Sequence, residues 1–357
     1  MVDIAVIPGD GIGKEIIPRV CEMLYSVDQS LNFVYYDISS QRYINNGITV
    51  TDKEINDLKG YKSIFFGAIG DFRVKPGIME QGVILKLRKE LDLYINIRPA
   101  ISFKKITGNE INITVLRENM EDFYSGISDT FTGTKKFKKQ DGMYNYDIDI
   151  SGTADNAIYY TLGMLSERNL NRFFKKAYEI ADSGIITVTD KANAIEMYSL
   201  WREIAGKQSS ISKKKINFEY ADSLAYNIIK NPLKYTYIIA PNLYGDIISD
   251  MTSSLAGGLG YAPSGNIGDK NSMFEPVHGS APDIAGRDIA NPVASILSSI
   301  MMLKHIKMNE PASIIEKSLK NIINDGIIPI ESGGPYTTSG FINQVVKRAT
   351  LLNNEVE

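Results

Sequence analysis

Cysteine and histidine are scarce in this chain. Among its 357 residues, Cys21 is the single cysteine, and His278 and His305 are the two histidines. A single cysteine excludes an intrachain disulfide, which fits a reducing compartment, and two histidines argue against a multi-histidine zinc site. We therefore expect a cytoplasmic protein without a disulfide framework or a histidine-rich metal centre.

Long apolar runs and a surplus of positive charge are missing as well. No apolar stretch approaches the about 20 residues that span a bilayer, and the opening MVDIAVIPGDG lacks the basic and apolar segments of a signal peptide. The formal net charge is -3, so no dominant basic surface is predicted. We expect neither a membrane nor a nucleic acid as a partner. An acidic small molecule is still compatible with this charge as a partner, because local arginines could bind it.

The N-terminal third alternates between strand and helix patterns. Strands are predicted at residues 3–8, 33–38 and 63–69, with helices at 12–27 and 52–58 between them. A helical run at 83–91 follows, and then a strand at 93–98 that is expected to stop at Pro99. Alternation of this kind is typical of an open α/β sheet.

The middle of the chain departs from this alternation and then returns to it. The polar stretch 128–149 has no helical period; we interpret it as an arm or hairpin, with a disordered loop as the alternative. A long helix is expected over 156–183, broken near 169–171. After it come predicted strands at 185–189, 216–220 and 235–240, which alternate with helices at 195–205 and 224–230.

The last third is expected to begin with a helix from Asp246, to continue as a glycine-rich segment and to end in helices near 293–307 and 312–324. The length is comfortable for two domains. No internal repeat and no Pro/Ser-rich linker marks a boundary, so we expect a division set by topology, with the chain crossing twice.

The first chemical motif is Gly9-Asp10-Gly11-Ile12-Gly13, between a predicted strand and a predicted helix. Glycines there let the backbone approach a phosphate at a helix N-terminus, but the third glycine of the dinucleotide fingerprint is missing. Asp37 ends the second strand and would bind the ribose in an ordinary dinucleotide fold. A strand-terminal acid that faces water is the favoured interpretation of Asp37.

Charged residues form two further candidate sites. Arg88, Arg98 and Arg117 could together hold a dicarboxylic acid, because guanidinium groups bind carboxylates in a bidentate way. Asp246 and Asp250 share one helical face, where a cation between them would relieve their repulsion. Oxygen ligands suit Mg²⁺ or Mn²⁺. From these residues alone, a plain acidic pair on a solvated helix is an equal alternative.

Two residues are candidates for proton transfer, and one loop is a candidate for cofactor binding. Lys191 follows a predicted strand, and Tyr124 lies seven residues after Arg117. A surface lysine and a core tyrosine are the ordinary alternatives. Residues 274–286 mix small residues, turn formers and one acid, which are the types needed by a loop that packs against an adenine and its ribose.

Taken together, these segments resemble the isocitrate/isopropylmalate dehydrogenase family from end to end. The matching sequences stand in family order: IPGDGIGKE, FFGAIGD, LKLRKELDLYINIRP, LRENMEDFY, VTDKANAIE, PNLYGDIISD and MFEPVHGSAPDIAGRDIANP. The resemblance implies an open two-domain α/β fold with a twisted mixed sheet, unlike the ordinary Rossmann fold, and a homodimer with shared active sites. It implies a cofactor domain at 1–99 plus 247–357, and a substrate and dimerisation domain at 100–246 with an arm near 125–152.

The resemblance also implies a role for each candidate residue. Arg88, Arg98 and Arg117 would bind the substrate carboxylates. Asp246 and Asp250 would bind the divalent cation together with Asp222 of the partner subunit. Lys191, also contributed across the dimer, would help to take the hydroxyl proton, and Tyr124 would protonate the carbon from which carbon dioxide leaves; the expected catalytic residues are thus Tyr124, Lys191 and Asp222. Further expected substrate contacts are Ile84, Leu85, Asn193 and Asp222, and expected cofactor contacts are Glu275, His278, Gly279, Ser280, Ala281, Pro282, Asp283, Ile284 and Asn291.

Two short segments bear on the choice of cofactor and substrate. NADP-using relatives tend to carry lysine and tyrosine where this chain has Asp283 and Ile284; a carboxylate there accepts hydrogen bonds from a ribose 2′-hydroxyl and repels a 2′-phosphate, so NAD is expected. Isocitrate enzymes place serine and asparagine at the positions of Gly82 and Ile84, and homoisocitrate enzymes can place a basic residue at Leu85. This apolar turn favours 3-isopropylmalate. D-malate or tartrate is the first alternative, with isocitrate or homoisocitrate behind it.

The resemblance has departures and one competing class. Met120 stands where relatives usually have threonine, and residues 128–149 match the family poorly. Some relatives are regulatory subunits that have lost catalysis, but such a chain would be expected to lack some of the catalytic and metal residues named above, and all are present. We therefore expect an active enzyme that converts 3-isopropylmalate to 4-methyl-2-oxopentanoate in leucine biosynthesis.

Overall fold

The centre of the molecule is a mixed β-sheet. The computed structural model describes residues 1–131, 134–141, 144–151 and 157–354. Within these residues the main sheet has ten strands in the order β11-β10-β12-β5-β4-β13-β14-β3-β1-β2. They are β1 (Val2–Gly9), β2 (Leu31–Tyr35), β3 (Ser63–Ala68), β4 (Ile95–Ile101), β5 (Asn112–Glu118), β10 (Ile186–Asp190), β11 (Ile216–Tyr220), β12 (Tyr237–Ala240), β13 (Pro263–Ile267) and β14 (Ser272–Pro276).

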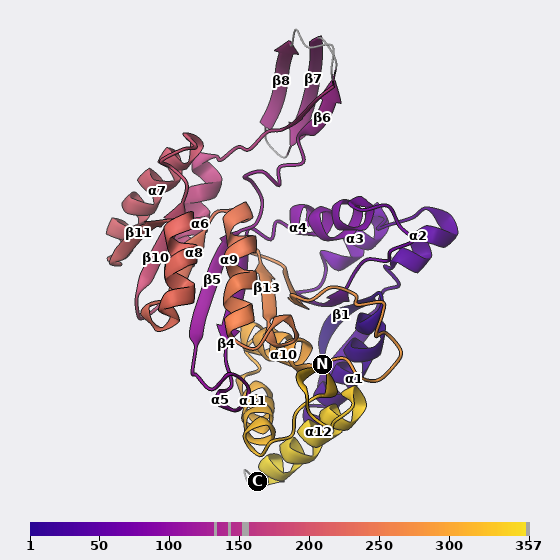
Figure 1. Ribbon diagram of the computed structural model, residues 1–357. Helices are drawn as coiled ribbons and strands as arrows, with labels where there is room; N and C mark the ends of the chain where they lie inside the picture. Colours follow the sequence, from indigo (N-terminus) through magenta and orange to yellow (C-terminus); the bar gives the residue numbers. More distant parts are fainter. Residues whose placement is uncertain (132–133, 142–143, 152–156, 355–357) are drawn as a thin grey trace.

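Helices flank the sheet, with α6 to α9 gathered around one half of it and α1 and α10 to α12 around the other end (Figure 1). None of the helices in the described residues combines the length and the apolarity that crossing a membrane requires. The helices are α1 (Ile12–Val27), α2 (Ser40–Asn46), α3 (Asp52–Leu58), the π-helical turn η1 (Glu80–Leu85), α4 (Lys86–Glu90), α5 (Lys104–Thr107), α6 (Glu167–Ile180), α7 (Met197–Ser212), α8 (Ala221–Lys230), α9 (Asn242–Leu255), α10 (Val293–His305), α11 (Asn309–Asn324) and α12 (Thr338–Asn354), with single 3-10 turns at η2 (Pro232–Lys234), η3 (Leu259–Tyr261) and η4 (Ile330–Ser332).

The sheet contains two parallel blocks that run in opposite directions. One block is β2, β1, β3 and β14, and the other is β5, β12, β10 and β11. Between them, β13 is antiparallel to both β14 and β4, and β4 is antiparallel to β5. The expectation of an open mixed sheet is confirmed, and the strand order differs from that of a Rossmann sheet.

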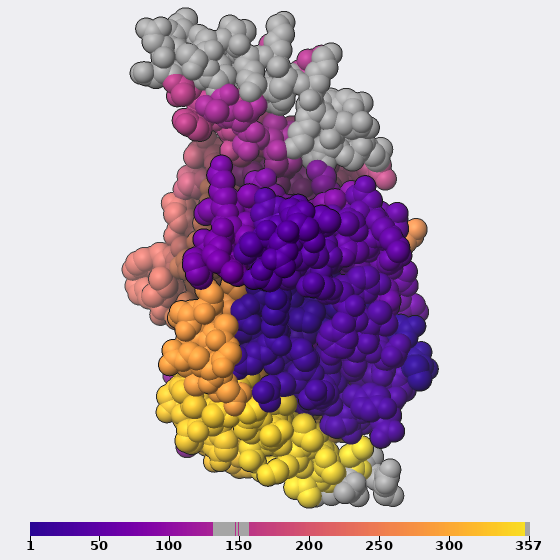
Figure 2. Space-filling model, turned by 90° about the vertical axis from the view of Figure 1, so that its right-hand side faces the viewer, coloured from indigo at the N-terminus to yellow at the C-terminus, as the bar shows by residue number. Residues whose placement is uncertain are grey.

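Burial on both faces explains the apolar runs of the central strands. Residues 4–7 of β1 and 64–66 of β3 have no exposed surface, because helices cover a parallel sheet on each side. Helix α1 packs against α12, so the first and the last helix lie side by side. Figure 2 shows the yellow C-terminal segment directly against the indigo and purple N-terminal third. The largest core cluster joins Phe65 to Trp201, from opposite sides of the predicted domain boundary. The division at residues 99 and 246 stays a prediction.

The polar stretch after β5 forms the expected arm. β6 (Ser128–Phe131) pairs with β9 (Ile158–Thr161), and β7 (Thr134–Asp141) pairs with β8 (Tyr144–Ser151), both antiparallel. Figure 1 shows β6, β7 and β8 projecting from one end of the body. In the residues that the structure describes, the hairpin interpretation is confirmed.

The expected long helix over 156–183 was wrong. Residue 156 lies outside the described residues, residues 158–161 form β9, and α6 runs without a break through 169–171. Asparagines disfavour helices when their side chains compete for the backbone. Here Asn169 donates to Glu118 Oε1 at 2.8 Å and accepts from Arg172 Nε at 2.9 Å, so its side chain has other partners.

Other boundaries also differ from those predicted, and some elements were not predicted at all. Strand β4 continues through Pro99, because β13 pairs only with residues 95–97 and leaves that side of the proline without a partner strand. The glycine-rich segment contains β13 and β14, which were not predicted. Strand β2 ends at Tyr35, and α9 begins at Asn242, a full turn before Asp246. Helix α12 was not predicted either.

Candidate active site

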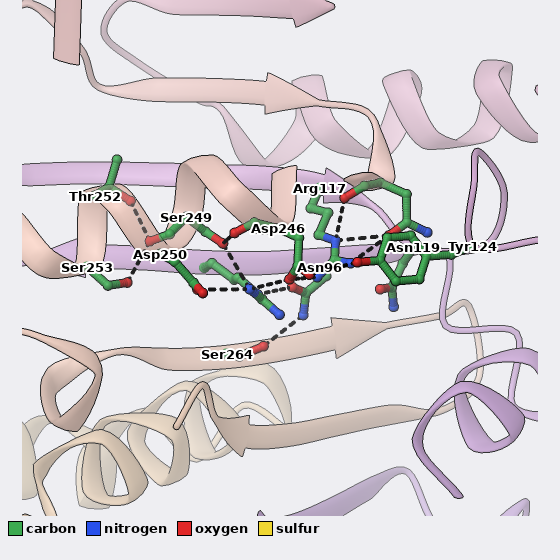
Figure 3. Close-up of polar contacts among 12 residues, drawn as sticks. Asn96, Arg117, Asn119, Tyr124, Asp246, Ser249, Asp250, Thr252, Ser253 and Ser264 are labelled. Carbon is green, nitrogen blue, oxygen red and sulfur yellow. Dashed lines mark hydrogen bonds and ion pairs between the residues drawn. The ribbon is translucent and has the colours of Figure 1, made fainter. Parts of the chain in front are cut away.

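Two buried arginines meet the acidic face of α9. Arg98 on β4 donates through NH1 to Asp246 Oδ1 at 3.0 Å and to Ser249 Oγ at 2.9 Å, and its NH1 lies 3.7 Å from Asp250 Oδ1. Arg117 on β5, which is 2% exposed, also donates through NH1 to Asp246 Oδ1. Figure 3 shows Asp246 and Asp250 projecting from the same side of α9, with Asp246 next to Arg117. The structure thus brings together four of the residues singled out in the sequence.

Arg88, the third arginine, lies in α4 and is also buried. Its NH2 group donates to Glu275 Oε1 on β14 at 3.2 Å. A residue predicted to bind substrate is therefore paired with a residue predicted to bind cofactor. Three cations and three carboxylates, those of Asp246, Asp250 and Glu275, share this part of the structure.

The charges in this cluster hold Asp246 ionised. Burial favours the protonated form of Asp246, but the positive charges of Arg117 and Arg98 outweigh burial, and the pKa of Asp246 is lowered. Burial raises the pKa of Asp250, and Arg98 only partly offsets this effect. Burial also lowers the pKa of Arg117, and repulsion from Arg98 adds to the effect. Asp246 is therefore the charged acceptor that balances the two guanidinium groups.

Tyr124 reaches the same carboxylate from the loop after β5. Its hydroxyl donates to Asp246 Oδ2 at 3.0 Å, and the Arg117 guanidinium lies 5.3 Å from its ring centroid. Burial raises the pKa of Tyr124, and the charge of Asp246 raises it further. The phenol is therefore protonated at neutral pH and can act as a proton donor.

Helix α9 is anchored by a residue that the motifs did not single out. Asp122, buried and in the left-handed conformation with φ 68°, accepts from the backbone N–H of Leu243 at 2.9 Å and from the hydroxyl of Tyr198 at 2.8 Å. A carboxylate at this end of a helix satisfies a free N–H and interacts favourably with the helix dipole. Asp122 therefore fixes the helix that carries Asp246. The sequence signal was its position just after a strand, two residues before Tyr124.

Arg117 is held along α9 by two further residues. Asn242 Oδ1 accepts from Arg117 Nε at 3.0 Å and from NH2 at 2.7 Å. Gly245 lies directly beneath the arginine stem, because a Cβ at this position would lie 2.7 Å from Arg117 Cγ. The glycine thus allows the close approach of β5 and α9 that brings Arg117 to Asp246.

Lys191 and Asp222 form a separate pair in the same chain. Lys191 Nζ lies 2.9 Å from Asp222 Oδ1, and the Asp222 side chain is 66% exposed. The hydrogen bond from Lys191 lowers the pKa of Asp222. Within the described residues, no three Cys, His, Asp or Glu side chains lie close enough to hold a metal ion. Asp222 therefore does not join Asp246 and Asp250 within one chain, and its role across a subunit boundary stays a prediction. Asn193 is exposed in the turn after β10.

Two loops expected near the cofactor contact each other. The N–H of Ile12 donates to Ser280 O at 2.9 Å. Gly11 has a φ of 52°, and a Cβ there would lie 1.9 Å from the same oxygen, so only glycine allows this approach. The loop 278–284, which lies between β14 and α10, is thereby fixed against the glycine motif after β1.

The side chains of this loop differ in their surroundings. Asp283, Pro282 and Gly279 are exposed, whereas Ala281 and Ile284 pack partly against the core. His278 Nε2 is buried and has no hydrogen-bond partner among the described residues, and burial lowers the pKa of this imidazole. A buried unpaired nitrogen and an exposed carboxylate on one loop suit a ligand with polar groups, as a dinucleotide has.

Asn291 and Asp37 have structural partners. Asn291 Oδ1 accepts from the N–H of Val293 at 3.0 Å, at the start of α10. Asp37 accepts from Ser39 Oγ at 2.9 Å. Together with Lys14 it lines a cavity of about 230 Å³ at the end of β2.

The apolar turn before Arg88 is π-helical. Ile84 and Leu85 lie at the end of η1, which continues directly into α4. Ile84 packs partly against a cluster of buried apolar side chains that includes Val83 and Leu87. The side chains of both Ile84 and Leu85 are only partly buried. The segment presents no charged side chain between Glu80 and Lys86.

Comparison with known proteins decides the family. A profile of the isocitrate/isopropylmalate dehydrogenase family matches residues 3–345. The chain belongs to this family. It is 33% identical to the 3-isopropylmalate/3-methylmalate dehydrogenase of Methanocaldococcus jannaschii, over 97% of this chain and 98% of that protein. It is likewise 33% identical to the 3-isopropylmalate dehydrogenase of Corynebacterium jeikeium, over 96% and 98% of the two chains.

Solved structures of the family share the fold. The isocitrate dehydrogenase of Methylococcus capsulatus superimposes with a TM-score of 0.86 at 28% identity, over 98% of this chain and 99% of that one. A β-decarboxylating dehydrogenase of Thermococcus kodakarensis gives a TM-score of 0.78 at 28% identity, over 100% and 99%. The family comprises metal-dependent, NAD(P)-using dehydrogenases that act on small hydroxy acids.

Proposed function

We propose that this protein is an NAD-dependent, decarboxylating 3-isopropylmalate dehydrogenase. The observation that carries the proposal is the apolar turn before Arg88. Ile84 and Leu85 would contact the isopropyl group, whereas the third carboxylate of isocitrate would lie against apolar side chains at a cost. The relatives named 3-isopropylmalate dehydrogenase support this choice.

The arginine cluster supports a dicarboxylic substrate. Asp246 takes the hydrogen bonds that Arg98 and Arg117 would offer to a substrate carboxylate. A substrate carboxylate would replace it, because a guanidinium group binds either anion in the same way. Asp246 would then be free to accept a cation.

Mg²⁺ or Mn²⁺ fits the donors that this exchange releases. Asp246 and Asp250 offer carboxylate oxygens on one helical face, and Asp222 of the partner subunit would supply a third. A bound divalent cation would act as a Lewis acid on the substrate hydroxyl and carboxylate. Lys191 would take the hydroxyl proton, and Tyr124 would return a proton to the carbon that loses carbon dioxide. NAD, held by loop 278–284, would accept the hydride.

A second copy of the chain is the partner that this reaction requires. Helices α8 and α9 expose large apolar side chains, including Tyr226 (64%), Ile229 (65%) and Ile247 (53%). Apolar side chains gathered on neighbouring helices favour a protein partner. A homodimer formed through these helices would bring Lys191 and Asp222 of each subunit to Asp246 and Asp250 of the other.

A substrate panel tests the proposal. Turnover is measured with 3-isopropylmalate, 3-methylmalate, D-malate, isocitrate and homoisocitrate, each with NAD and with NADP, in the presence of Mg²⁺. We expect the highest kcat/KM for 3-isopropylmalate with NAD. A tenfold or greater preference for isocitrate or D-malate would show that the pocket before Arg88 has been misassigned.

A further inference from the structure

A row of buried polar side chains lies beside the arginine cluster in the middle of the sheet. Asn96 on β4 is the direct cross-strand partner of Asn266 on β13, and Arg117 lies opposite Asn96 on β5. Directly opposed residues project from the same face of a sheet. Both asparagines have no exposed surface, so their amide groups can be satisfied only within the protein or by a bound ligand.

Hydrogen bonds run through this row from one arginine to another. Asn96 Oδ1 accepts from Arg98 Nε at 2.7 Å, and Asn96 Nδ2 donates to Asn266 Oδ1 at 3.0 Å. Asn266 Nδ2 donates to Glu275 Oε1 at 2.8 Å, and the same oxygen accepts from Arg88 NH2 at 3.2 Å. Figure 3 shows the neighbouring contact from Asn96 to Ser264. An unbroken chain of contacts therefore joins the guanidinium groups of Arg98 and Arg88.

Asn266 uses its full hydrogen-bonding capacity. Its oxygen accepts from Asn96 and from Asn119 Nδ2, each at 3.0 Å, and its nitrogen donates to Glu275 and, at 3.3 Å, to Met273 O. An amide has two acceptor and two donor positions, and all four are used here. A buried network that is satisfied in this way restricts its members to one orientation.

We propose that Asn96 and Asn266 are positioning residues for substrate binding. They fix the orientation of Arg98 and, through Glu275, of Arg88, and so set the spacing at which two carboxylates of one acid are bound. Asn266 also ties this arrangement to β14, the strand that leads into loop 278–284. Asn96 therefore acts on the acid alone, whereas Asn266 acts on the acid and the cofactor. This inference rests on the proposed function.

The test compares Asn96→Leu and Asn266→Leu with a matched control. Asn271 is another buried asparagine, in the loop between β13 and β14, and within the described residues its amide nitrogen donates to the backbone oxygens of Lys59 and Tyr61. Asn271→Leu therefore removes a buried amide without touching the arginines. If Asn266→Leu does not fold, Asn266→Ser, which keeps a hydroxyl in the row, replaces it.

We expect the KM for 3-isopropylmalate to rise about tenfold to a hundredfold in Asn96→Leu and Asn266→Leu, since a hydrogen bond to a charged group is lost, with kcat changed little. The KM for NAD should rise in Asn266→Leu and not in Asn96→Leu. Asn96→Asp keeps the acceptor for Arg98 and should recover most of the affinity for the acid.

Two different results would count against these statements. If the wild type turns over 3-isopropylmalate but the variants shift its KM no more than Asn271→Leu does, the positioning role is wrong and the proposed function stands. If the wild type is inactive with every acid in the panel, the proposed function is wrong, and the inference falls with it.

Discussion

Replacement of Asp246 by asparagine separates two contributions of one carboxylate. In the structure Asp246 forms ion pairs with Arg98 and Arg117, and in the proposed reaction it would bind the divalent cation. Removing one partner of a buried ion pair costs about 3–5 kcal/mol. The Asp246 side chain is 36% exposed, so water screens part of this interaction. We expect Asp246→Asn to lower the free energy of unfolding by about 1–3 kcal/mol, between the values for buried and surface pairs.

Asp250→Asn is the matched comparison. Asp250 lies on the same helical face, but its side chain is 55% exposed and Oδ1 is 3.7 Å from the single arginine nitrogen it approaches. We expect Asp250→Asn to lower the free energy of unfolding by less than about 1 kcal/mol, because a surface ion pair screened by water contributes little. Both variants should nevertheless lose Mg²⁺-dependent turnover, because each removes one oxygen ligand.

The assay is equilibrium denaturation of the two variants and the wild type in excess chelator, followed by activity as Mg²⁺ is added back. Chelator keeps metal binding out of the stability comparison. Equal stability of Asp246→Asn and the wild type, or a larger loss in Asp250→Asn, would refute the reasoning about the arginines. Full activity of the wild type in excess chelator would refute the metal role.

Three other predictions concern the cofactor, pH and the approach of β5 to α9. Asp283→Lys combined with Ile284→Tyr should raise the KM for NAD about tenfold to a hundredfold and improve the use of NADP, while Asp37→Asn changes neither by more than a few fold in steady-state kinetics; the reverse pattern would move the ribose to Asp37. Burial, with repulsion from Glu121, raises the pKa of Glu118 from 4.5 to about 7, so the folded state binds this proton more tightly and stability should fall as pH rises from about 4.5 to 7. Glu118→Gln should flatten that fall in denaturation curves, and an unchanged slope would assign it to other groups. Gly245→Ala should displace Arg117 and raise the KM for the acid by about tenfold or more in a protein that still folds, whereas an unaltered KM would mean that the stem can shift without harm.

Local patterns predicted the elements whose residues face a continuous core. β1, α1, β3 and α10 were predicted to within about two residues because their apolar periodicity reflects the burial of their own side chains. β13 and β14 were not, since PSGNI has mostly small and polar residues and SMFEP is a short segment that ends in proline, so neither has the alternating pattern of a strand; each lies between two other strands of the sheet. Pro99 was expected to end a strand and Asn169 to break a helix, and neither does. In both cases tertiary contacts outweigh the local preference of the residue.

The candidate site was predicted in part because its charged residues are unusual in number and spacing. Arg98, Arg117, Asp246 and Asp250 do lie together, as the family motifs implied. Asn96, Asn242 and Asp122 lie inside the matched segments but were not singled out, because an amide or a capping carboxylate has no obvious chemical role until its partners are known. For Asn96 the sequence does hold a signal. Side chains of a strand alternate between the two faces of a sheet, so Asn96, two residues before Arg98, lies on the same face of β4 as Arg98.

The late position of β13 and β14 in the chain has a consequence for folding during synthesis. In space these strands lie between β4 and β3, yet they are made after β10, β11 and β12. Until residue 276 has left the ribosome, β3 and β4 have no strands to join them, and Arg88 has no Glu275 to neutralise it. The edges of β3 and β4 therefore stay unpaired until a segment much later in the chain has been synthesised. Long-range pairing of this kind slows folding and exposes edges to association, so the nascent chain is most vulnerable to aggregation between the synthesis of β5 and that of β14.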